Sequence, residues 1–437
     1  MKNSKGKVRD FLKNKGMDPA DIDIDRTCRL FLDEMDKGLA GRKSSLAMLP
    51  TYIETESRIP RNTPVIVMDA GGTNFRVATV AFGNGGKAAI ENFRLFKMPG
   101  SAGKVSKEEF FRTMAGYIKH VARISESVGF CFSYPIEMFP SKDGRVLYFS
   151  KEIQAPHVQG QMIGENLNLA IAAAGLGPEK KMVLLNDTVA ALLAGRADPS
   201  GRLFDTHIGF ILGTGTNCSY VERNKNITKA KDLNPVGSQI INVESGAFGK
   251  APRGTVDRKF DRSLTNPGVN VFEKMISGAY LGPVCMWTIL AAAKAKLFSG
   301  ATADRLAAIT GLSTEDLSHF VYNPHGRDNV LSAALADADE QDAETLYRLV
   351  DRMIERAAKL TAINLSSVAL KSGKGSNPTR PVCIVAEGTT YYHLTSLKQR
   401  VEYYLKQYLV DRKGVHYQTI SVENATLIGA AIAGLTN

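Results

Sequence analysis

Cysteine is scarce in this sequence, with five residues among 437. The five are widely spaced, odd in number and form no CxxC pair, which excludes a disulfide framework and a cysteine-rich zinc site. Cys131, Cys218 and Cys383 lie in apolar segments, so we expect small buried side chains there. No apolar run reaches the ~18 residues of a membrane-spanning helix, and the first residues lack the apolar core of a signal peptide. We therefore expect a cytoplasmic protein with no membrane partner.

The common nucleotide-binding motifs are also missing. There is no GxxxxGK[ST] sequence, and no GxGxxG follows an apolar strand segment, so a nucleotide site would have to be built differently. The formal charge is +11, but there is no arginine-rich run. Basic residues are interleaved with acidic ones except for a mild excess at the amino terminus. We interpret the charge as a solvated surface and expect no nucleic-acid partner.

What is present is the composition of an ordinary globular protein. Hydrophobic residues make up 44% and charged residues 23% of the chain, and its length allows two or three domains. The first sixty residues look helical, with Asp23 or Asp25 as a cap and an apolar stripe at Leu32, Met35 and Leu39.

From residue 64 onward, apolar strand segments alternate with helical ones. Strands are expected at residues 64–69, 75–82, 129–133, 181–187, 206–213, 217–222, 238–244 and 381–388. Helices are expected at residues 271–282, 286–298 and 344–370. This mixture predicts an α/β fold.

Two of the segments share one plan. MDAGGTNFRVATV (68–80) and ILGTGTNCSYVE (211–222) each contain an apolar strand, a turn rich in glycine and threonine, and a second apolar strand. We interpret them as hairpins of two similar half-domains that offer their turns to one cleft. Such turns can expose backbone N–H groups and hydroxyls to an anion. A single turn of this kind is equally well explained as an ordinary hairpin turn without a ligand. Two such turns, with Asp69 beside the first, favour a cleft that binds a polyphosphate.

Asn186 and Asp187 stand where an apolar strand runs into a helix. An acid at this position can simply cap the helix. Strand ends that lead into helices are also where α/β folds place catalytic groups, and a carboxylate beside a substrate hydroxyl can accept its proton.

Three further fragments hold polar side chains in apolar settings. They contain Ser133, the pair Ser150 and Lys151, and the pair Asn242 and Glu244. Carboxylates and amides suit a polyol because they form hydrogen bonds with adjacent hydroxyls. Each fragment alone is weak, since Lys151 is by default a surface lysine and Glu244 a turn residue.

Taken in order, seven segments resemble the eukaryotic-type hexokinase family, which includes glucokinase. They lie at residues 44–57, 68–77, 130–135, 184–195, 211–222, 241–249 and 266–282. The similarity returns faintly at residues 384–392. One copy of the family pattern fills the chain, so the sequence resembles the enzymes with a single catalytic unit.

The resemblance implies an α/β, two-lobed sugar-kinase fold of the actin-like, RNase H-like type, with the substrates in a cleft between a small and a large domain. Residues 1–60 would be a helical segment packed on the large domain, 61–187 the small domain and 188–437 the large domain. The C-terminal helix, at about residues 424–437, would return to the small domain. The implied reaction transfers the γ-phosphoryl group of ATP to the 6-hydroxyl of a hexose such as glucose, with Mg²⁺ on the nucleotide.

The resemblance also assigns roles to matching positions. Asp187 is the implied general base, with Lys151 and Arg76 as further catalytic residues. The implied sugar-binding residues are Ser133, Ser150, Lys151, Asn186, Asp187, Asn217, Glu244 and Glu273. The implied ATP-binding residues are Asp69, Gly71, Gly72, Thr73, Asn74, Gly213, Thr214, Gly388 and Thr389. Asp69 would also approach the metal through a water molecule.

The sequence departs from the family pattern near the sugar and the adenosine. Residues 148–152 read YFSKE where the family commonly has NWTKG, Ser245 follows Glu244 where tryptophan is usual, and residues 387–391 read EGTTY in place of DGSVY. Two alternatives to a glucose-phosphorylating enzyme therefore stay open. One is a catalytically silent sugar-binding or regulatory protein, which we would expect to have lost the base. The other is a kinase that prefers mannose, fructose or an amino sugar.

Overall fold

The amino-terminal helices pack on the longest helix of the molecule. The computed structural model describes residues 4–149, 153–198, 200–326 and 328–437. Helices α1 (Ser4–Asn14) and α2 (Ile24–Leu39) lie against α12 (Glu340–Ser372). Asp23 caps α2, since its carboxylate accepts a hydrogen bond of 3.0 Å from Arg26 N. The helical expectation fails at β1 (Leu49–Pro50), which pairs with a strand near residue 240 because its backbone completes a sheet edge.

The first large sheet has five strands in the order β4-β3-β2-β5-β8. Its strands are β2 (Val65–Gly71), β3 (Asn74–Phe82), β4 (Ala88–Lys97), β5 (Ser127–Phe132) and β8 (Lys181–Leu185). The first three are antiparallel neighbours, and β2, β5 and β8 run parallel. The sequence analysis missed β4, an edge strand whose side chains are mostly exposed and so lack an apolar pattern.

The second large sheet repeats this plan and adds β1 at one edge. Its order is β1-β11-β10-β9-β12-β13. Its further strands are β9 (Thr206–Leu212), β10 (Thr216–Arg223), β11 (Ser238–Asn242), β12 (Val382–Glu387) and β13 (Tyr417–Ile420). Numbered along the chain, five strands of each sheet lie in the order 3-2-1-4-5, which confirms the repeat read from the two hairpins. A small hairpin, β6 (Ile136–Met138) and β7 (Gly144–Val146), lies beside the first sheet.

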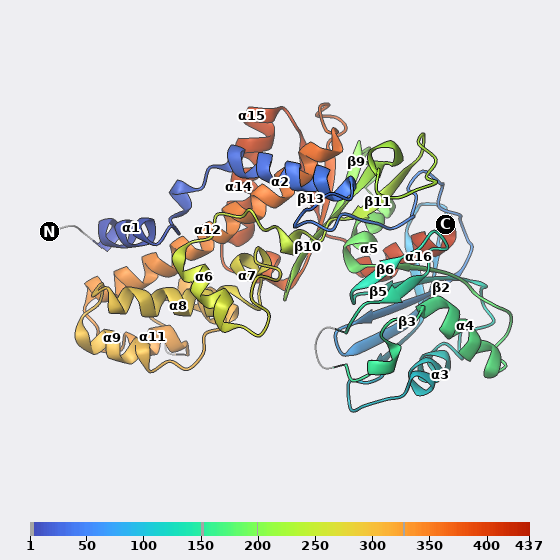
Figure 1. Cartoon of the computed structure of the whole chain (residues 1–437), viewed down its shortest axis with the longest axis horizontal. Helices are drawn as coiled ribbons and strands as arrows, with labels where there is room; N and C mark the ends of the chain where they lie inside the picture. The colour runs from blue at the N-terminus through green and yellow to red at the C-terminus, as the bar shows by residue number, and fades with distance from the viewer. Residues whose placement is uncertain (1–3, 150–152, 199, 327) are drawn as a thin grey trace.

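Helices α5 (Asp187–Ala194) and α16 (Ala425–Thr436) lie between the two sheets (Figure 1). Helix α5 contacts β9 and β10, α16 contacts β2 and β5, and the two helices contact each other. Glycines allow this close packing. A Cβ on Gly129 would lie 1.8 Å from the carbonyl oxygen of Ala430, and one on Gly429 would lie 1.9 Å from that of Ala190.

The remaining helices cover the outer faces. Helices α3 (Lys107–Tyr117) and α4 (Ile163–Ala173) form one core with the five-stranded sheet. The helices α7 (Glu273–Ile276), α8 (Leu281–Lys294), α10 (Thr314–Tyr322) and α14 (Leu397–Leu405) contact α12. Helices α6 (Thr255–Ser263) and α9 (Gly300–Ala307) contact α8, α11 (Val330–Ala334) contacts α9 and α10, and α13 (Thr389–His393) contacts α14. Helix α15 (Asp411–Lys413) follows α14 in the chain. Within the described ranges, no helix combines the length and the apolar character that a membrane crossing needs.

The helix expected at residues 271–282 is wrong, because α7 ends at Ile276 and α8 begins at Leu281. The helix is interrupted by contacts with a distant segment. Between α7 and α8, the backbone N–H groups bind carbonyls of the second hairpin: Gly278 N donates to Gly213 O (2.8 Å) and Ala279 N donates to Thr214 O (3.1 Å). All five cysteines are buried and free, which confirms the burial expected for Cys131, Cys218 and Cys383.

Candidate functional site

The first glycine turn joins β2 to β3. Gly71 pairs with Asn74 at the end of the hairpin, and Gly72 has φ +62°, a left-handed conformation that favours glycine. The side chains of Thr73 and Asn74 are exposed at the tip. The hydroxyl of Tyr134 donates a hydrogen bond to the carbonyl of Gly72, and this bond stabilises the turn.

Asp69 lies at the base of this turn and is almost completely buried. It faces Arg76 across the hairpin, and Arg76 Nη1 lies 3.0 Å from Asp69 Oδ2. Thr426 Oγ1, on α16, donates to the same oxygen at 2.9 Å. Burial raises the pKa of Asp69, while Arg76 and the hydrogen bond from Thr426 act in the opposite direction.

Ser133 lies beside Asp69 and Gly71. It follows β5, and its N–H donates to Ala70 O at 3.0 Å. A Cβ added to Gly71 would lie 3.7 Å from Ser133 Oγ and 3.8 Å from Asp69 Oδ1. The parallel pairing of β2 and β5 thus brings three predicted site residues together.

Asn186 and Asp187 form the junction between β8 and α5, as the sequence predicts. Asn186 is the helix cap, since its Oδ1 accepts hydrogen bonds from Thr188 N (2.9 Å) and Thr188 Oγ1 (2.6 Å). The Asp187 carboxylate is half-buried in the first turn, with Oδ1 2.8 Å from Thr188 N. The charges of Asp69 and Asp187 both raise the pKa of Cys131, after the larger effect of burial, so the two acids lie near one thiol.

The second glycine turn joins β9 to β10. Gly213 N donates to Gly215 O (2.9 Å), and Gly213 O accepts from Thr390 Oγ1 (2.9 Å). Gly388, with φ +112°, packs against this turn so closely that a Cβ would lie 2.4 Å from Leu212 O. Because of this contact, Gly388 and the exposed Thr389 lie beside the turn that carries Thr214.

Asn217, Asn242 and Glu244 form a connected polar cluster at the ends of β10 and β11. Glu244 Oε1 accepts hydrogen bonds from Asn242 Nδ2 (2.7 Å) and Asn217 Nδ2 (3.1 Å). Glu273 Oε2 accepts a hydrogen bond from Thr216 N at 2.9 Å. Burial raises the pKa of Glu244, and the charge of Glu273 raises it further, while the two amides oppose both effects.

Tyr148, in the loop after β7, lies close enough to Glu244 and Glu273 to be affected by their charges. Burial raises the pKa of Tyr148, and the charges of Glu244 and Glu273 raise it further. Its neighbour Phe149 packs edge-on against Tyr134, with ring centroids 5.3 Å apart. The segment that leads to residue 150 therefore lies between the first glycine turn and the carboxylates of the second sheet. Ser150 and Lys151 lie outside the described residues.

Comparison with known families decides the identity. Residues 8–197 match one family model described as Hexokinase, and residues 207–436 match a second with the same description. The chain belongs to the hexokinase family. Phosphorylation of a hexose by ATP is therefore its class of reaction, and the enzymatic reading is favoured over a silent binding protein.

Relatives cover nearly the whole chain. Hexokinase-2 of Oryza sativa subsp. japonica is 30% identical over 426 residues, which are 91% of this chain and 85% of the relative. Hexokinase-1 of Schizosaccharomyces pombe is 26% identical over 428 residues, 94% of this chain and 86% of the relative. The solved hexokinase from Schistosoma mansoni, complexed with glucose, has a TM-score of 0.76 at 25% identity and covers 99% of this chain and 98% of its own. The predicted two-lobed sugar-kinase fold is confirmed.

In this hexokinase a buried serine follows Glu244, where tryptophan is usual in the family. Ser245 is completely buried, and its Oγ accepts a hydrogen bond of 3.2 Å from Asn364 Nδ2 on α12. Ser245 N also donates to Asn217 Oδ1 at 3.3 Å. Asn364 thus supports the turn that carries Glu244.

The sequence analysis missed three residues that hold the site. Thr426, Tyr134 and Asn364 each bond to a site residue or its neighbour from a distant part of the chain. Asn364 lies in a helix that reads as core, where a lone polar residue gives no signal of its partner. Thr426 lies in residues 424–430, where the sequence departs from the glycine-rich pattern usual near the end of the family, and nothing there indicates its contact with Asp69. Tyr134 lies in a quoted motif, but its ring reads as a core aromatic.

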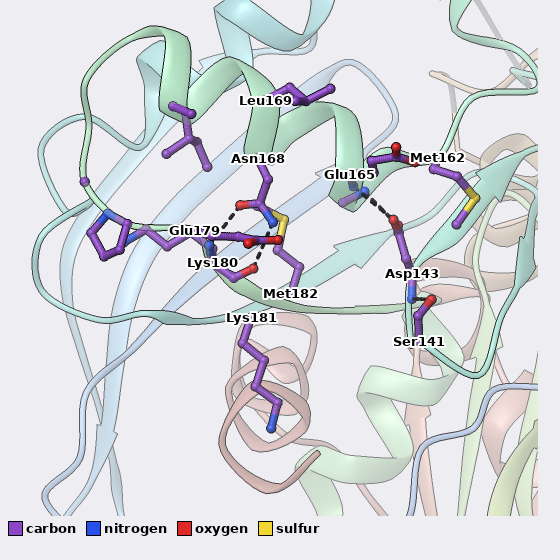
Figure 2. Close-up of a pocket in the computed structure, with 15 residues that line it drawn as sticks. Ser141, Asp143, Met162, Glu165, Asn168, Leu169, Glu179, Lys180, Lys181 and Met182 are labelled. Carbon is purple, nitrogen blue, oxygen red and sulfur yellow. Dashed lines mark hydrogen bonds between the residues drawn. The ribbon is translucent and has the colours of Figure 1, made fainter.

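A separate hollow of about 620 Å³ lies between α4 and β8 (Figure 2). Among the described residues, none of the predicted site residues lines it. Its central polar groups bind the chain itself. Asp143 Oδ1 accepts from Gly164 N (2.7 Å), and Asn168 exchanges two hydrogen bonds of 2.9 Å with the backbone of Lys180. These hydrogen bonds hold α4 against the sheet, and the hollow is distinct from the hexokinase site.

Proposed function

We propose that this hexokinase transfers the γ-phosphoryl group of ATP to the 6-hydroxyl of glucose, with Asp187 as the general base. The observation that carries the proposal is the placement of Asp187 at the junction of β8 and α5, near Asp69 and between the two sheets. The relative from Schistosoma mansoni was solved with glucose, which favours this sugar.

Asp187 suits the role of a base because its carboxylate is oriented and partly shielded. One oxygen accepts a hydrogen bond from Thr188 N, which restrains the carboxylate. A fixed carboxylate beside the 6-hydroxyl can accept its proton as the oxygen attacks phosphorus. Lys151 and Arg76 complete the proposed catalytic set, and Arg76 is tethered to Asp69.

The sugar is assigned to groups from both sheets. From the first come Ser133, Asn186 and Asp187, and from the second come Asn217, Glu244 and Glu273. Ser150 and Lys151 belong to the proposed sugar set through their sequence positions alone. Neighbouring amide and carboxylate oxygens such as those of Asn217 and Glu244 match the adjacent hydroxyls of a hexose.

The two glycine turns are proposed to hold ATP. Gly71, Gly72, Thr73 and Asn74 would meet the phosphates from one side and Gly213 and Thr214 from the other, with Gly388 and Thr389 beside the adenosine.

A metal ion on the nucleotide would meet Asp69 through water. Among the described residues there is no cluster of three or more acidic, histidine or cysteine side chains able to hold a metal. A single carboxylate fits Mg²⁺ that is held mainly by phosphate oxygens and water. When bound, Mg²⁺ would neutralise charge on the phosphates.

We also propose that the sheets define two lobes, a small domain at residues 61–187 and a large domain at 188–437. Residues 1–60 pack on the large domain through α12, and α16 returns to β2 and β5. Closure of the lobes over the sugar would exclude water, which otherwise competes as the phosphoryl acceptor.

The test is a coupled ADP-release assay on the intact protein with glucose, mannose, fructose and glucosamine. We expect turnover on glucose, with glucose 6-phosphate identified by nuclear magnetic resonance. Faster turnover on another sugar would overturn the choice of glucose but not the reaction class. Asp187→Ala is the control for contaminating kinase activity. Sugar binding without turnover on any hexose would contradict the proposal.

A further inference from the structure

Two donors to Asp69 share one oxygen, and the thiol of Cys131 is a third hydrogen-bond partner of the carboxylate. Arg76 Nη1 and Thr426 Oγ1 approach Oδ2 at 3.0 and 2.9 Å. The second oxygen, Oδ1, lies on the side of Gly71, where an added Cβ would be 3.8 Å from it. The carboxylate therefore presents Oδ1 to the first glycine turn.

The two donors differ in how firmly they are placed. Arg76 is a long side chain with 45% exposure, so its contact is flexible and competes with water. Thr426 is β-branched, with few rotamers, and comes from the first turn of α16. Its hydroxyl is the more rigid of the two contacts.

The position of α16 is itself fixed by close packing. A Cβ on Gly429 would lie 1.9 Å from Ala190 O on α5, and a Cβ on Gly434 would lie 2.7 Å from Gly129 N on β5. Helix α16 therefore cannot slide along either neighbour without a backbone clash. Since α5 begins at Asp187, one packed unit carries both Asp187 and Thr426.

We propose that Thr426 is a positioning residue that orients Asp69 for the metal-bound nucleotide. Its hydroxyl holds Oδ2 so that Oδ1 faces the glycine turn and accepts a hydrogen bond from metal-bound water. The inference rests on the proposed function, which places Mg²⁺·ATP at this turn. It adds a residue from the far end of the chain to the nucleotide site.

The test measures binding of AMPPNP by isothermal titration calorimetry at saturating glucose, with Mg²⁺ and with a chelator. Thr426→Val keeps the shape of the side chain but removes the hydroxyl. We expect it to weaken the affinity for Mg²⁺·AMPPNP about tenfold, because a hydrogen bond to a charged group is lost. Thr426→Ser should keep the affinity within about twofold. Metal-free AMPPNP should bind the parent and the valine variant alike.

The matched control is Thr436→Val on the same helix, where Thr436 Oγ1 donates to Ile432 O at 2.8 Å. It should leave both affinities unchanged. If Thr426→Val does not fold, Thr426→Ala takes its place, with thermal unfolding to report stability. Equal loss of metal-bound and metal-free affinity would show a merely structural role and overturn the inference.

Asp69→Asn separates this inference from the function on which it rests. If Asp69→Asn does not change the affinity for Mg²⁺·AMPPNP, the proposed place of Asp69 is wrong. If Asp69→Asn weakens that affinity but Thr426→Val does not, the inference about Thr426 alone is overturned.

Discussion

The hydroxyl of Tyr134 donates a hydrogen bond to the carbonyl of Gly72, across 62 positions of the chain. The tyrosine is buried, and its ring contacts Phe149, which directly precedes the segment assigned to the sugar. One side chain thus touches both the first glycine turn and Phe149, which precedes the proposed sugar-binding residues Ser150 and Lys151.

Tyr134→Phe should therefore weaken ATP binding while the aromatic packing stays intact. Loss of one neutral hydrogen bond predicts an increase of about two- to tenfold in the KM for ATP, with little change in the KM for glucose. The control is Tyr117→Phe, which removes a hydroxyl that donates to Lys97 O at 2.9 Å in the same sheet. An equal rise of both KM values in the Tyr134 variant would argue against a role for Tyr134 in holding the first glycine turn for ATP.

Glu244 predicts a pH dependence of sugar binding. Its pKa is raised by burial and by Glu273, so protonation begins at a higher pH than for an ordinary glutamate. In the proposed sugar site the ionised carboxylate of Glu244 accepts hydrogen bonds from sugar hydroxyls, so the KM for glucose should rise as the pH falls through the raised pKa. Glu244→Gln should raise the KM about 10- to 100-fold and abolish this dependence.

The matched control for Glu244 is Glu222→Gln on β10. Glu222 Oε2 accepts a hydrogen bond from Tyr220 Oη at 2.7 Å, so its loss should affect stability and not the KM for glucose. A pH dependence that persists in Glu244→Gln would assign the titration to another group.

His207 predicts a loss of stability in mild acid. Burial, together with the charge of the nearby Arg196, lowers its pKa from 6.5 to about 4. Below pH 6.5 His207 is protonated in the unfolded chain, whereas in the folded chain it stays neutral until about pH 4. The free energy of unfolding therefore falls as the pH falls across this range. Urea unfolding should show a loss of about 3 kcal/mol across this range that His207→Gln removes. The exposed His325→Gln should keep the slope, and a parent slope unchanged by His207→Gln would refute the assignment.

Two glycine substitutions should change the free energy of unfolding in opposite directions, because Gly129 lies at the close contact between β5 and α16 and Gly116 faces open space. Gly129→Ala drives a Cβ into the backbone of Ala430 and should cost more than about 2 kcal/mol of unfolding free energy. Gly116→Ala, in α3 with no atom within 4 Å of the new Cβ, should stabilise by about 0.5–1 kcal/mol. Thermal and chemical unfolding measure both, and a mild effect of Gly129→Ala would mean that α16 can move away from the sheet.

Local patterns in the sequence predicted the parts of the site that are local in the fold. Both hairpins and the junction at Asn186 and Asp187 follow from strand and turn patterns, and the structure has them. The contacts between Thr426 and Asp69 and between Gly278 and Gly213 join distant segments. No local pattern encodes such contacts, since they arise only when the two sheets and the helices between them assemble.

The edge strand β4 shows a different limit of pattern reading. Its side chains are largely exposed, so no alternation of buried and exposed residues marks it in the sequence. It forms because its backbone completes the hydrogen bonds of β3, as in the pairing of Phe75 with Phe96.

The most direct test of the account compares catalysis and sugar binding in Asp187→Asn. The coupled assay gives kcat with glucose, and calorimetry gives the glucose Kd of the same variant. Loss of a general base predicts a kcat about 10²–10⁴-fold lower, with a Kd changed less than about tenfold. A kcat within about tenfold of the parent value, with glucose still bound, would contradict the assignment of Asp187 as the base.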